Sequence, residues 1–513
     1  MASAPMTPAG HGGEPPAPKP GGGVQRVQST AEGDVLATSA AGPAAVRGGA
    51  LRLSSFATAS LIALVSGALL YRHLGIVDTG RYTTALSLVA LVAAASDLGL
   101  SAIGIRELSI RTGDSKEQMA RTLLGLRVVV TGLGVLAVTA FALLAYGSTL
   151  GFGVLLAGVG LVFQVWQSTL SIPLMVDLRL GWTSLFEFLR QLLVSILIIA
   201  LVFSGAGLLS FLACSIPASV AVLALTIALF RGQVPMRFRF AMSDWRALLR
   251  PVLSYAIAVA ASALYFRVAI VLVSLLSTAR QLGYFSLSFN IMAALFAIPA
   301  LLVTSAFPIF SRAARDDHGR LAYALERVFE VSLIAGAWMS LAIALGADFA
   351  IKIVGGAKFA PAANVLAIQG ISVGATFVGT VWGFGLLSLG RHRAILLFNL
   401  AALAAIVVAV SILSSLDGAR GAAIGASAVE VAYAVIGARV LIYGRPHLRP
   451  SLRVLPKVTL AIAFAATPLL IPASEPVRVA LSGAIYLAAL VILRALPPEL
   501  VALLPSNRVR RAR

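Results

Sequence analysis

Apolar stretches of roughly twenty residues recur along this chain from Leu51 onward, separated by short polar breaks. A helix of about that length crosses the hydrocarbon core of a bilayer. Of the 513 residues, 59% are hydrophobic and 12% are charged, whereas soluble domains carry about a quarter charged residues. The sequence therefore predicts an all-α polytopic membrane protein.

The apolar stretches predict about fourteen membrane spans. We place them near residues 52–71, 83–105, 122–146, 151–173, 183–204, 207–230, 251–276, 283–310, 328–346, 362–388, 394–413, 421–442, 455–472 and 477–496. The first fifty residues are rich in Pro, Gly and Ser, which is typical of a disordered tail.

A weak internal repeat suggests two lobes. Gly80-Arg-Tyr-Thr-Thr opens the second span, and Gly283-Tyr-Phe-Ser opens the eighth. Spans six apart have the same orientation, so the repeat predicts two six-helix lobes. Alternatively, Gly with aromatic residues merely marks a membrane interface. The expected domains are a cytoplasmic tail (1–50), an N-lobe (51–230), a cytoplasmic linker (231–250), a C-lobe (251–442), a helix pair (443–496) and a basic cytoplasmic tail (497–513).

The positive charges predict the orientation of the chain. Most of the 40 Lys and Arg residues fall in every second inter-span segment and near the two termini. Cytoplasmic segments of membrane proteins are enriched in Lys and Arg, so we expect both termini inside. Topology and anionic lipid then account for the net charge of +20, and nucleic-acid binding has no separate domain to perform it.

Cysteine and histidine are too sparse to build a metal centre. Cys214 is the single cysteine, and the five histidines are scattered without metal-ligand spacing. We expect no metal, no other cofactor and no disulfide framework. Coupling to a proton or sodium gradient stays open.

Arg267 is the most unusual residue of the spans. It lies inside the seventh span, and no acidic residue occurs between Tyr255 and Arg280. An arginine at this depth costs roughly 2.5–3.5 kcal/mol on insertion scales, so it faces a watery cavity, an anionic ligand or a carboxylate of another span. Small residues, among them Ala263 and Ser274, share its helix face, which allows close packing or an open cavity. We expect Arg267 to bind an anionic substrate; the alternatives are pairing with a carboxylate of another span and snorkelling of the side chain toward the membrane surface.

Other polar residues at membrane depth are further candidates. As substrate-binding residues we add Asn290, Arg127, Gln164 and Gln167; as ion-coupling residues, Glu430 and Asp97. Asp97 and Arg127 lie at similar depth on consecutive antiparallel spans, so mutual neutralisation is equally plausible. Glu430 is an isolated carboxylate that binds a proton or, alternatively, only joins helices.

Several segments carry a family resemblance. The chain resembles the polysaccharide biosynthesis (Wzx-type) flippases of the MOP exporter superfamily over roughly residues 51–500. The motifs are Asp97-Leu-Gly-Leu-Ser-Ala with Arg106-Glu-Leu, Phe307-Pro-Ile-Phe-Ser-Arg, Val354-Gly-Gly-Ala-Lys-Phe-Ala-Pro-Ala-Ala-Asn-Val-Leu and Gly418-Ala-Arg-Gly-Ala-Ala.

This resemblance implies a fourteen-helix, two-lobed exporter in the bacterial cytoplasmic membrane. Its expected cargo is an undecaprenyl-diphosphate-linked oligosaccharide, turned from the inner to the outer leaflet by alternating access. Membrane lipids and other polysaccharide assembly proteins are the expected partners. Many relatives have Arg-x-Asp in the seventh span, whereas Arg267 is followed by Val268 and Ala269. This departure removes a counter-charge and puts the coupling mechanism in doubt.

Other classes of function remain as alternatives. A lipid II flippase would move a peptidoglycan precursor, and a multidrug or cation antiporter of the same superfamily would ordinarily have twelve spans and acidic sites. A membrane glycan polymerase or ligase would typically carry a long outer loop, whereas the longest outer connection here, near residues 347–361, is short. We therefore expect a transporter rather than an enzyme.

Overall fold

The computed structural model describes residues 41–97, 99–231, 238–240, 242, 244–245, 253–316 and 318–497. Within these ranges the chain is α-helical, with three short 3-10 helices and no β-strand. This confirms the predicted all-α class. Residues 1–40 of the expected tail and residues 498–513 of the basic tail lie outside the described residues.

Seven α-helices follow the first, long helix before the linker. The first half of the chain forms α1 (Ala41–Asp97), α2 (Leu100–Ile110), α3 (Gly113–Tyr146), α4 (Ser148–Leu170), α5 (Ile172–Val176), α6 (Leu180–Phe203), α7 (Leu208–Ala213) and α8 (Ser215–Leu229). Helix α1 begins within the segment expected to be a tail, where alanine, the best helix former, is frequent.

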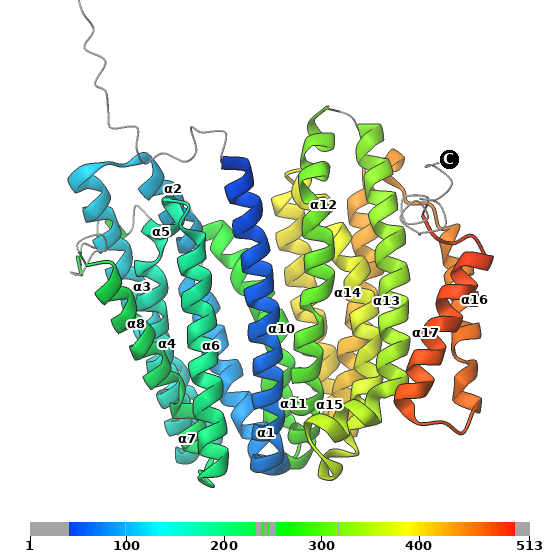
Figure 1. Cartoon of the computed structure of the whole chain (residues 1–513), viewed down its shortest axis with the longest axis horizontal. Coiled ribbons are helices and arrows are strands. Elements are labelled where there is room, and N and C mark those ends of the chain that lie inside the picture. Colours follow the sequence, from blue (N-terminus) through cyan, green and yellow to red (C-terminus); the bar gives the residue numbers. More distant parts are fainter. Residues whose placement is uncertain are drawn as a thin grey trace, which may run out of the picture. The chain divides into compact units, whose positions relative to one another are not determined.

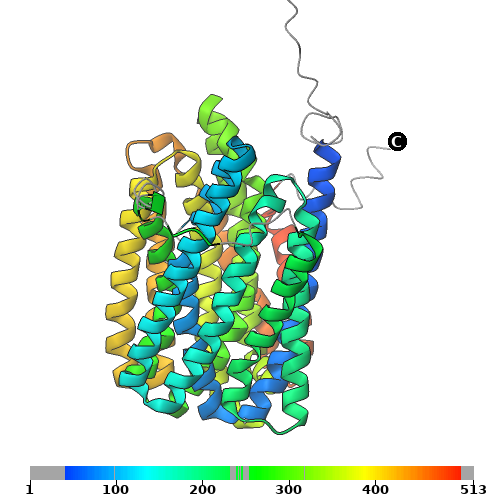
Figure 2. The ribbon, with the colours of Figure 1, turned by 90° about the vertical axis from the view of Figure 1, so that its left-hand side faces the viewer.

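The second half and the C-terminal pair are also helical. They form α10 (Leu253–Leu276), α11 (Ala279–Leu295), α12 (Ala297–Asp316), α13 (His318–Val354), α14 (Ala362–Ser388), α15 (His392–Ile442), α16 (Val454–Ala465) and α17 (Glu475–Ile492). The 3-10 helices are Ala357–Phe359, Pro446–Leu448 and Thr467–Leu470. Figures 1 and 2 show the long helices standing side by side, roughly parallel or antiparallel to one another.

Two of the helices are bent where the sequence predicts a break between spans. Helix α1 bends at Gly75, which has φ 74°. Helix α15 bends at Asp417 and Gly418, and the latter has φ 53°. Glycine adopts positive φ without the steric cost of a Cβ atom, so the chain can reverse there within a few residues. Ten described helices are long and apolar enough to cross a membrane. The count of about fourteen spans, which takes each bent helix as two, stays a prediction.

Hydrophobic clusters form on both sides of the linker. In the first half, one cluster contains Leu88, Val154 and Phe211. In the second half, another joins Phe310 and Trp382 to residues of α16 and α17. Helix α17 is fixed to α13 where the Tyr486 hydroxyl donates to the Ile334 carbonyl at 2.9 Å and Tyr486 stacks on Trp338. The C-terminal pair is thus packed on the second half.

The described part of the linker is attached to the first half. The Arg239 amide donates to the Arg121 carbonyl at 3.3 Å, and its guanidinium donates to Gln118 at 2.9 Å. The Arg239 carbonyl lies where a side chain at Gly125 would begin, 2.6 Å from the position of a Cβ atom. The side chain of Trp245 is buried in a cluster of α2 and α3 residues. The linker therefore holds α2 and α3 together.

Candidate functional site

Arg267 lies in α10, where helices of the two halves meet. Its guanidinium carbon is 5.6 Å from the centre of the Phe289 ring on α11, a cation–π distance. It is also within electrostatic range of Tyr71 on α1. Among the described side chains, no carboxylate pairs with Arg267. The half-buried, permanently charged guanidinium of Arg267 therefore contacts aromatic rings but no anionic group. It remains able to bind an anion.

The Arg-x-Asp departure has a structural counterpart. Val268 and Ala269 are buried in a hydrophobic cluster of α10, α11 and α15. An aspartate at position 269 would be buried among apolar side chains, where an unpaired charge is costly. Nothing at this position neutralises Arg267.

Asn290 contributes to a contact between the two halves. Its amide group donates to the Thr83 hydroxyl of α1 at 3.0 Å and to the Ser286 carbonyl at 2.9 Å. Both amide hydrogens are used inside the protein. Its predicted role in substrate binding would depend on the remaining carbonyl oxygen or on breaking the bond to Thr83.

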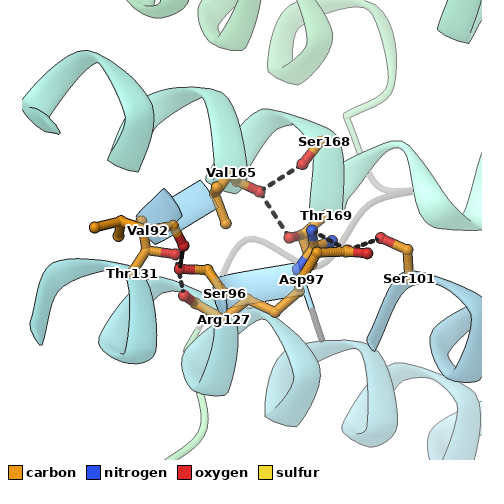
Figure 3. A network of polar contacts seen from close by, with 9 residues as sticks. All are labelled: Val92, Ser96, Asp97, Ser101, Arg127, Thr131, Val165, Ser168 and Thr169. Carbon is orange, nitrogen blue, oxygen red and sulfur yellow. Dashed lines mark hydrogen bonds and ion pairs between the residues drawn. The ribbon is translucent and has the colours of Figure 1, made fainter. Parts of the chain in front are cut away.

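Asp97 and Arg127 form a charged pair in the first half (Figure 3). Arg127 donates to Asp97 at 2.9 Å, and the Ser101 hydroxyl donates to the same carboxylate oxygen. The Arg127 side chain is 5% exposed and that of Asp97 is 40% exposed. The pair lies beside a break in the second span, because α1 ends at Asp97 and Gly99 has φ 78°. Mutual neutralisation, anticipated as an alternative, is the arrangement found.

The two glutamines differ in their surroundings. Gln167 is buried, and its amide group donates to the hydroxyls of Ser171 at 3.0 Å and Thr226 at 3.2 Å. The bond to Thr226 joins α4 to α8. Gln164, on α4, is half-buried. The geometry of Gln167 is that of helix packing, and its role in substrate binding stays a prediction.

Glu430 is at the centre of a polar group in the second half. It is 8% exposed on α15, and its carboxylate accepts a hydrogen bond from the Tyr265 hydroxyl at 2.6 Å. The Thr376 hydroxyl lies 3.3 Å from the second carboxylate oxygen. Within the described ranges, no Lys or Arg forms an ion pair with Glu430. The carboxyl group is held by hydroxyls alone.

A cavity of about 310 Å³ adjoins Glu430. Its lining also includes Asn399, whose side-chain carbonyl accepts from the Tyr433 hydroxyl at 3.0 Å and whose amide donates to Ser262 at 2.9 Å. These residues come from α10 and from both arms of α15. Sequence reasoning missed Tyr265, Asn399 and Tyr433, because their spacing along the chain does not indicate that they meet.

A larger groove lies between the second half and the C-terminal pair. Its volume is about 1070 Å³, and its walls come from α13, α14, α15 and α16. Most of the lining side chains are apolar, such as Leu333, Val378 and Val435. Arg439 and Arg449 line the same groove near the end of α15. An apolar groove of this volume with two guanidinium groups in its lining is a feature that the sequence did not predict.

Comparisons with known proteins agree with this architecture. Residues 69–364 match the family of polysaccharide biosynthesis proteins, and this match covers more than half of the chain. No curated protein matches at a significant level.

Solved structures share the fold at low sequence identity. A lipid II flippase, MurJ, in an inward closed conformation has a TM-score of 0.73 at 12% identity, covering 86% of this chain and 99% of its own. An inward-facing multidrug resistance MATE transporter of the MOP superfamily has a TM-score of 0.58 at 16% identity, with coverages of 78% and 97%. A MOP superfamily transporter from Pyrococcus furiosus has a TM-score of 0.52 at 15% identity, with coverages of 79% and 95%.

These neighbours are flippases and transporters, not enzymes, which is the class expected from the sequence. The family match and the fold also confirm the resemblance drawn from the motifs. The chain therefore belongs to the polysaccharide biosynthesis protein family. It is a multi-pass membrane protein by its long apolar helices, and it shares its fold with the flippase MurJ and with MATE transporters.

Proposed function

We propose that this protein turns an undecaprenyl-diphosphate-linked oligosaccharide from the inner to the outer leaflet of the bacterial cytoplasmic membrane. The chain acts by alternating access, with both termini in the cytoplasm. Other polysaccharide assembly proteins supply the cargo and consume it. The observation that carries the proposal is Arg267, a charged group between the two halves without a carboxylate partner in the described chain.

The chemistry of the cargo fits Arg267. A diphosphate presents several anionic oxygens, and guanidinium binds such oxygens with paired, charge-assisted hydrogen bonds. The guanidinium carbon lies 5.6 Å from the centre of the Phe289 ring, and a cation–π contact does not use the N–H donors as hydrogen bonds to an acceptor would. The donors can therefore serve the ligand. Tyr71 and Phe289 belong to different halves, so a ligand on Arg267 would bind where the two halves meet. Binding there can influence their relative movement.

The groove between α13 and α16 fits the remaining part of the cargo. A prenyl chain is apolar and long, and it needs a continuous apolar surface to leave the bilayer with its head group. The lining is apolar along most of its length, and Arg439 and Arg449 offer positive charge at one end. That end is predicted to be cytoplasmic, where the cargo is made.

Glu430 is the proposed coupling residue, and the proton is the proposed coupling ion. The single hydrogen of the Thr376 hydroxyl has two acceptors in reach: the Ser372 carbonyl at 2.8 Å and the Glu430 carboxylate at 3.3 Å. When that hydrogen is donated to the nearer carbonyl, a protonated Glu430 can donate to the Thr376 oxygen instead, so the site offers a hydrogen-bond partner to either form of the carboxyl group. A neutral acid without a basic partner is suited to accept and release a proton. Asp97 is the second proposed coupling residue.

A lipid II flippase is the second candidate function. It is favoured by the similarity of the fold to MurJ, a lipid II flippase, at a TM-score of 0.73. Both cargoes are prenyl diphosphates, so Arg267 and the groove suit either one. The family match favours a polysaccharide precursor.

Purified protein in liposomes tests the proposal. We expect rapid transfer of a polyprenyl-diphosphate oligosaccharide between leaflets, measured as loss of accessibility to a membrane-impermeant glycosidase. Lipid II and a fluorescent phosphatidylcholine are the comparison lipids in parallel vesicles. Faster transfer of lipid II would favour the second candidate. Equal transfer of all three lipids, or transfer no faster than in protein-free vesicles, would contradict both.

Filling the groove is expected to slow transfer only when the prenyl chain is long. Val435 lines the groove and is 55% exposed, so Val435→Trp adds bulk to the groove without disturbing a packed core. We expect several-fold slower flipping of the undecaprenyl substrate and unchanged flipping of an analogue with two isoprene units. Ile436→Trp is the matched control, since Ile436 is the next residue, is 48% exposed and is not part of the groove lining. Unchanged flipping of the long substrate by Val435→Trp would remove the groove from the transport path.

A further inference from the structure

The cavity beside Glu430 extends from that residue toward one end of the second half. On α14 its lining runs from Thr376 to Leu387, which is in the last turn of the helix. On the first arm of α15 the lining begins at Ile395, in the first turn. These two helix ends meet at the short connection between α14 and α15. The distribution of Lys and Arg predicts this end to be cytoplasmic.

The opposite side of Glu430 is closed by apolar packing. Ile270 of α10, Val410 of the first arm of α15 and Ala423 of the second arm are each 0% exposed. All three belong to one hydrophobic cluster, and each lies between the level of Glu430 and the predicted outer end of its own helix or arm. The cavity therefore adjoins Glu430 from the predicted cytoplasmic side, and close-packed side chains separate the carboxyl group from the outer side.

The groups around Glu430 carry no charge that would compete for its proton. Tyr265 comes from α10 and Thr376 from α14, and both contact the carboxyl group. Asn399 and Tyr433 come from the two arms of α15 and line the same cavity. Among the described residues that line this cavity, Glu430 alone has a charged form at neutral pH. No positive side chain in the lining repels a proton that moves along it.

The polar groups of the lining are suited to water. Thr380 donates to the Thr376 carbonyl of its own helix at 2.7 Å, so its oxygen can still accept a hydrogen bond. Asn399 donates one amide hydrogen to Ser262 at 2.9 Å and has a second one. A volume of about 310 Å³ has room for several water molecules, and such sites in proteins need polar partners of this kind.

We infer that this cavity is the route by which Glu430 exchanges its proton with the cytoplasm. On release, the O–H bond of the acid breaks, the proton passes to a water molecule in the cavity, and the electron pair stays on the carboxylate. The Tyr265 hydroxyl, which donates at 2.6 Å, stabilises the charge that forms. The reverse transfer restores the neutral acid. This inference rests on the proposed coupling role of Glu430 and adds the side of the membrane with which the proton is exchanged.

The proton route is separate from the proposed cargo site. Tyr265 and Arg267 are two positions apart on α10, which places them about 200° apart around the helix. Tyr265 bonds to Glu430, whereas Arg267 contacts the Phe289 ring and is not part of the cavity lining. Helix α10 thus carries the proton site on one face and the cargo arginine on another. A change in the position of this one helix acts on both.

A carboxyl reagent tests the inference on the unaltered protein. Dicyclohexylcarbodiimide is apolar and adds to protonated carboxyl groups, and mass spectrometry of peptides locates the adduct. The labelling is done in membrane vesicles of known orientation, with the pH set separately on the two sides. We expect labelling of Glu430 to fall as the cytoplasmic side is made alkaline and to stay constant when only the outer pH changes. Glu430→Gln supplies the blank. Labelling that follows the outer pH, or neither pH, would overturn the inference.

Cysteines along the route provide a second test. Thr380→Cys in a Cys214→Ala background removes only a hydrogen bond within α14 and places a thiol in the cavity lining. A small water-soluble methanethiosulfonate should label it from the cytoplasmic side. Ser427→Cys, one turn from Glu430 toward the outer end, should stay unlabelled from either side, because Ser427 is 4% exposed. Labelling of Ser427→Cys from outside, or none of Thr380→Cys from inside, would contradict the route.

Filling the cavity should block this labelling. Gly383 lines the cavity one turn beyond Thr380 toward the cytoplasmic end, and a Cβ atom there meets nothing within 4 Å. We expect Gly383→Leu to slow the labelling of Thr380→Cys several-fold. Gly132→Leu is the matched control, since a Cβ atom on Gly132 of α3 also meets nothing within 4 Å. Equal rates in the two leucine variants would count against the route.

The outcomes separate the proton route from the transport function. None of these measurements needs a cargo. A protein that shows the expected labelling but does not flip the lipid-linked oligosaccharide would refute the proposed function and keep the route. Active flipping together with labelling of Glu430 that ignores the cytoplasmic pH would refute the route and keep the function.

Discussion

Replacing Arg267 with alanine is expected to lower the flipping rate by roughly ten- to a hundredfold, with normal amounts of protein in the membrane. The reason is the loss of charge-assisted hydrogen bonds to the diphosphate, which contribute about 1.5–3 kcal/mol. Arg267→Lys keeps the positive charge without the planar fork, so its rate should fall between those of alanine and arginine. Flipping in vesicles and membrane abundance are to be measured side by side.

A lower amount of Arg267→Ala protein in the membrane would instead assign Arg267 a role in folding. If the arginine neutralised a buried carboxylate, alanine would leave that charge unpaired and reduce the amount of folded protein. The described structure holds no such partner, so abundance should be preserved. An abundant and fully active Arg267→Ala protein would exclude this residue from the mechanism.

Glu430→Gln is expected to abolish the response of transport to an imposed proton gradient. The amide has nearly the shape of a neutral acid and can still contact Tyr265 and Thr376, but it cannot release a proton. Flipping down a substrate gradient should persist, whereas acceleration by an acidic exterior should disappear. Rates in vesicles with and without a pH gradient across the membrane give the answer.

Tyr265→Phe is the companion of this variant. It keeps the ring and removes the hydrogen bond to Glu430, so the gradient should still act, with an altered pH dependence. A sodium gradient is the alternative driving force to be imposed in the same vesicles. Full acceleration by protons in Glu430→Gln would leave Glu430 as a contact between helices and would direct attention to Asp97.

The sequence predicts the helical class well, because the length and composition of each apolar stretch are fixed by the bilayer. The pairing of Asp97 with Arg127 was also foreseeable, since consecutive spans are antiparallel and place residues of equal depth side by side. Arg267 is identifiable in the same way, by its charge at membrane depth. Each of these inferences depends on how deep a residue lies along its span. That depth can be read from a single sequence.

Rotation of the helices and contacts between distant spans could not be predicted. Tyr265 and Glu430 are 165 positions apart and meet because α10 packs on α15. Spans that face lipid on one side and protein on the other are apolar on both faces, so their helical periodicity is weak. The sequence therefore gives little information on which face of a span packs against protein. The groove lined by α13, α14, α15 and α16 likewise results from the packing of four helices, and no short sequence motif encodes it.

The attachment of the linker has a consequence for synthesis on the ribosome. Arg239 and Trp245 are made after the helices they bind and before α10, and their sites on α2 and α3 are already complete by then. Domains generally fold as units in the order of their synthesis. The linker can thus fix α2 against α3 while the seventh span is still within the translation machinery. This order lets Asp97 and Arg127 pair with each other before the charged groups of the second half are inserted.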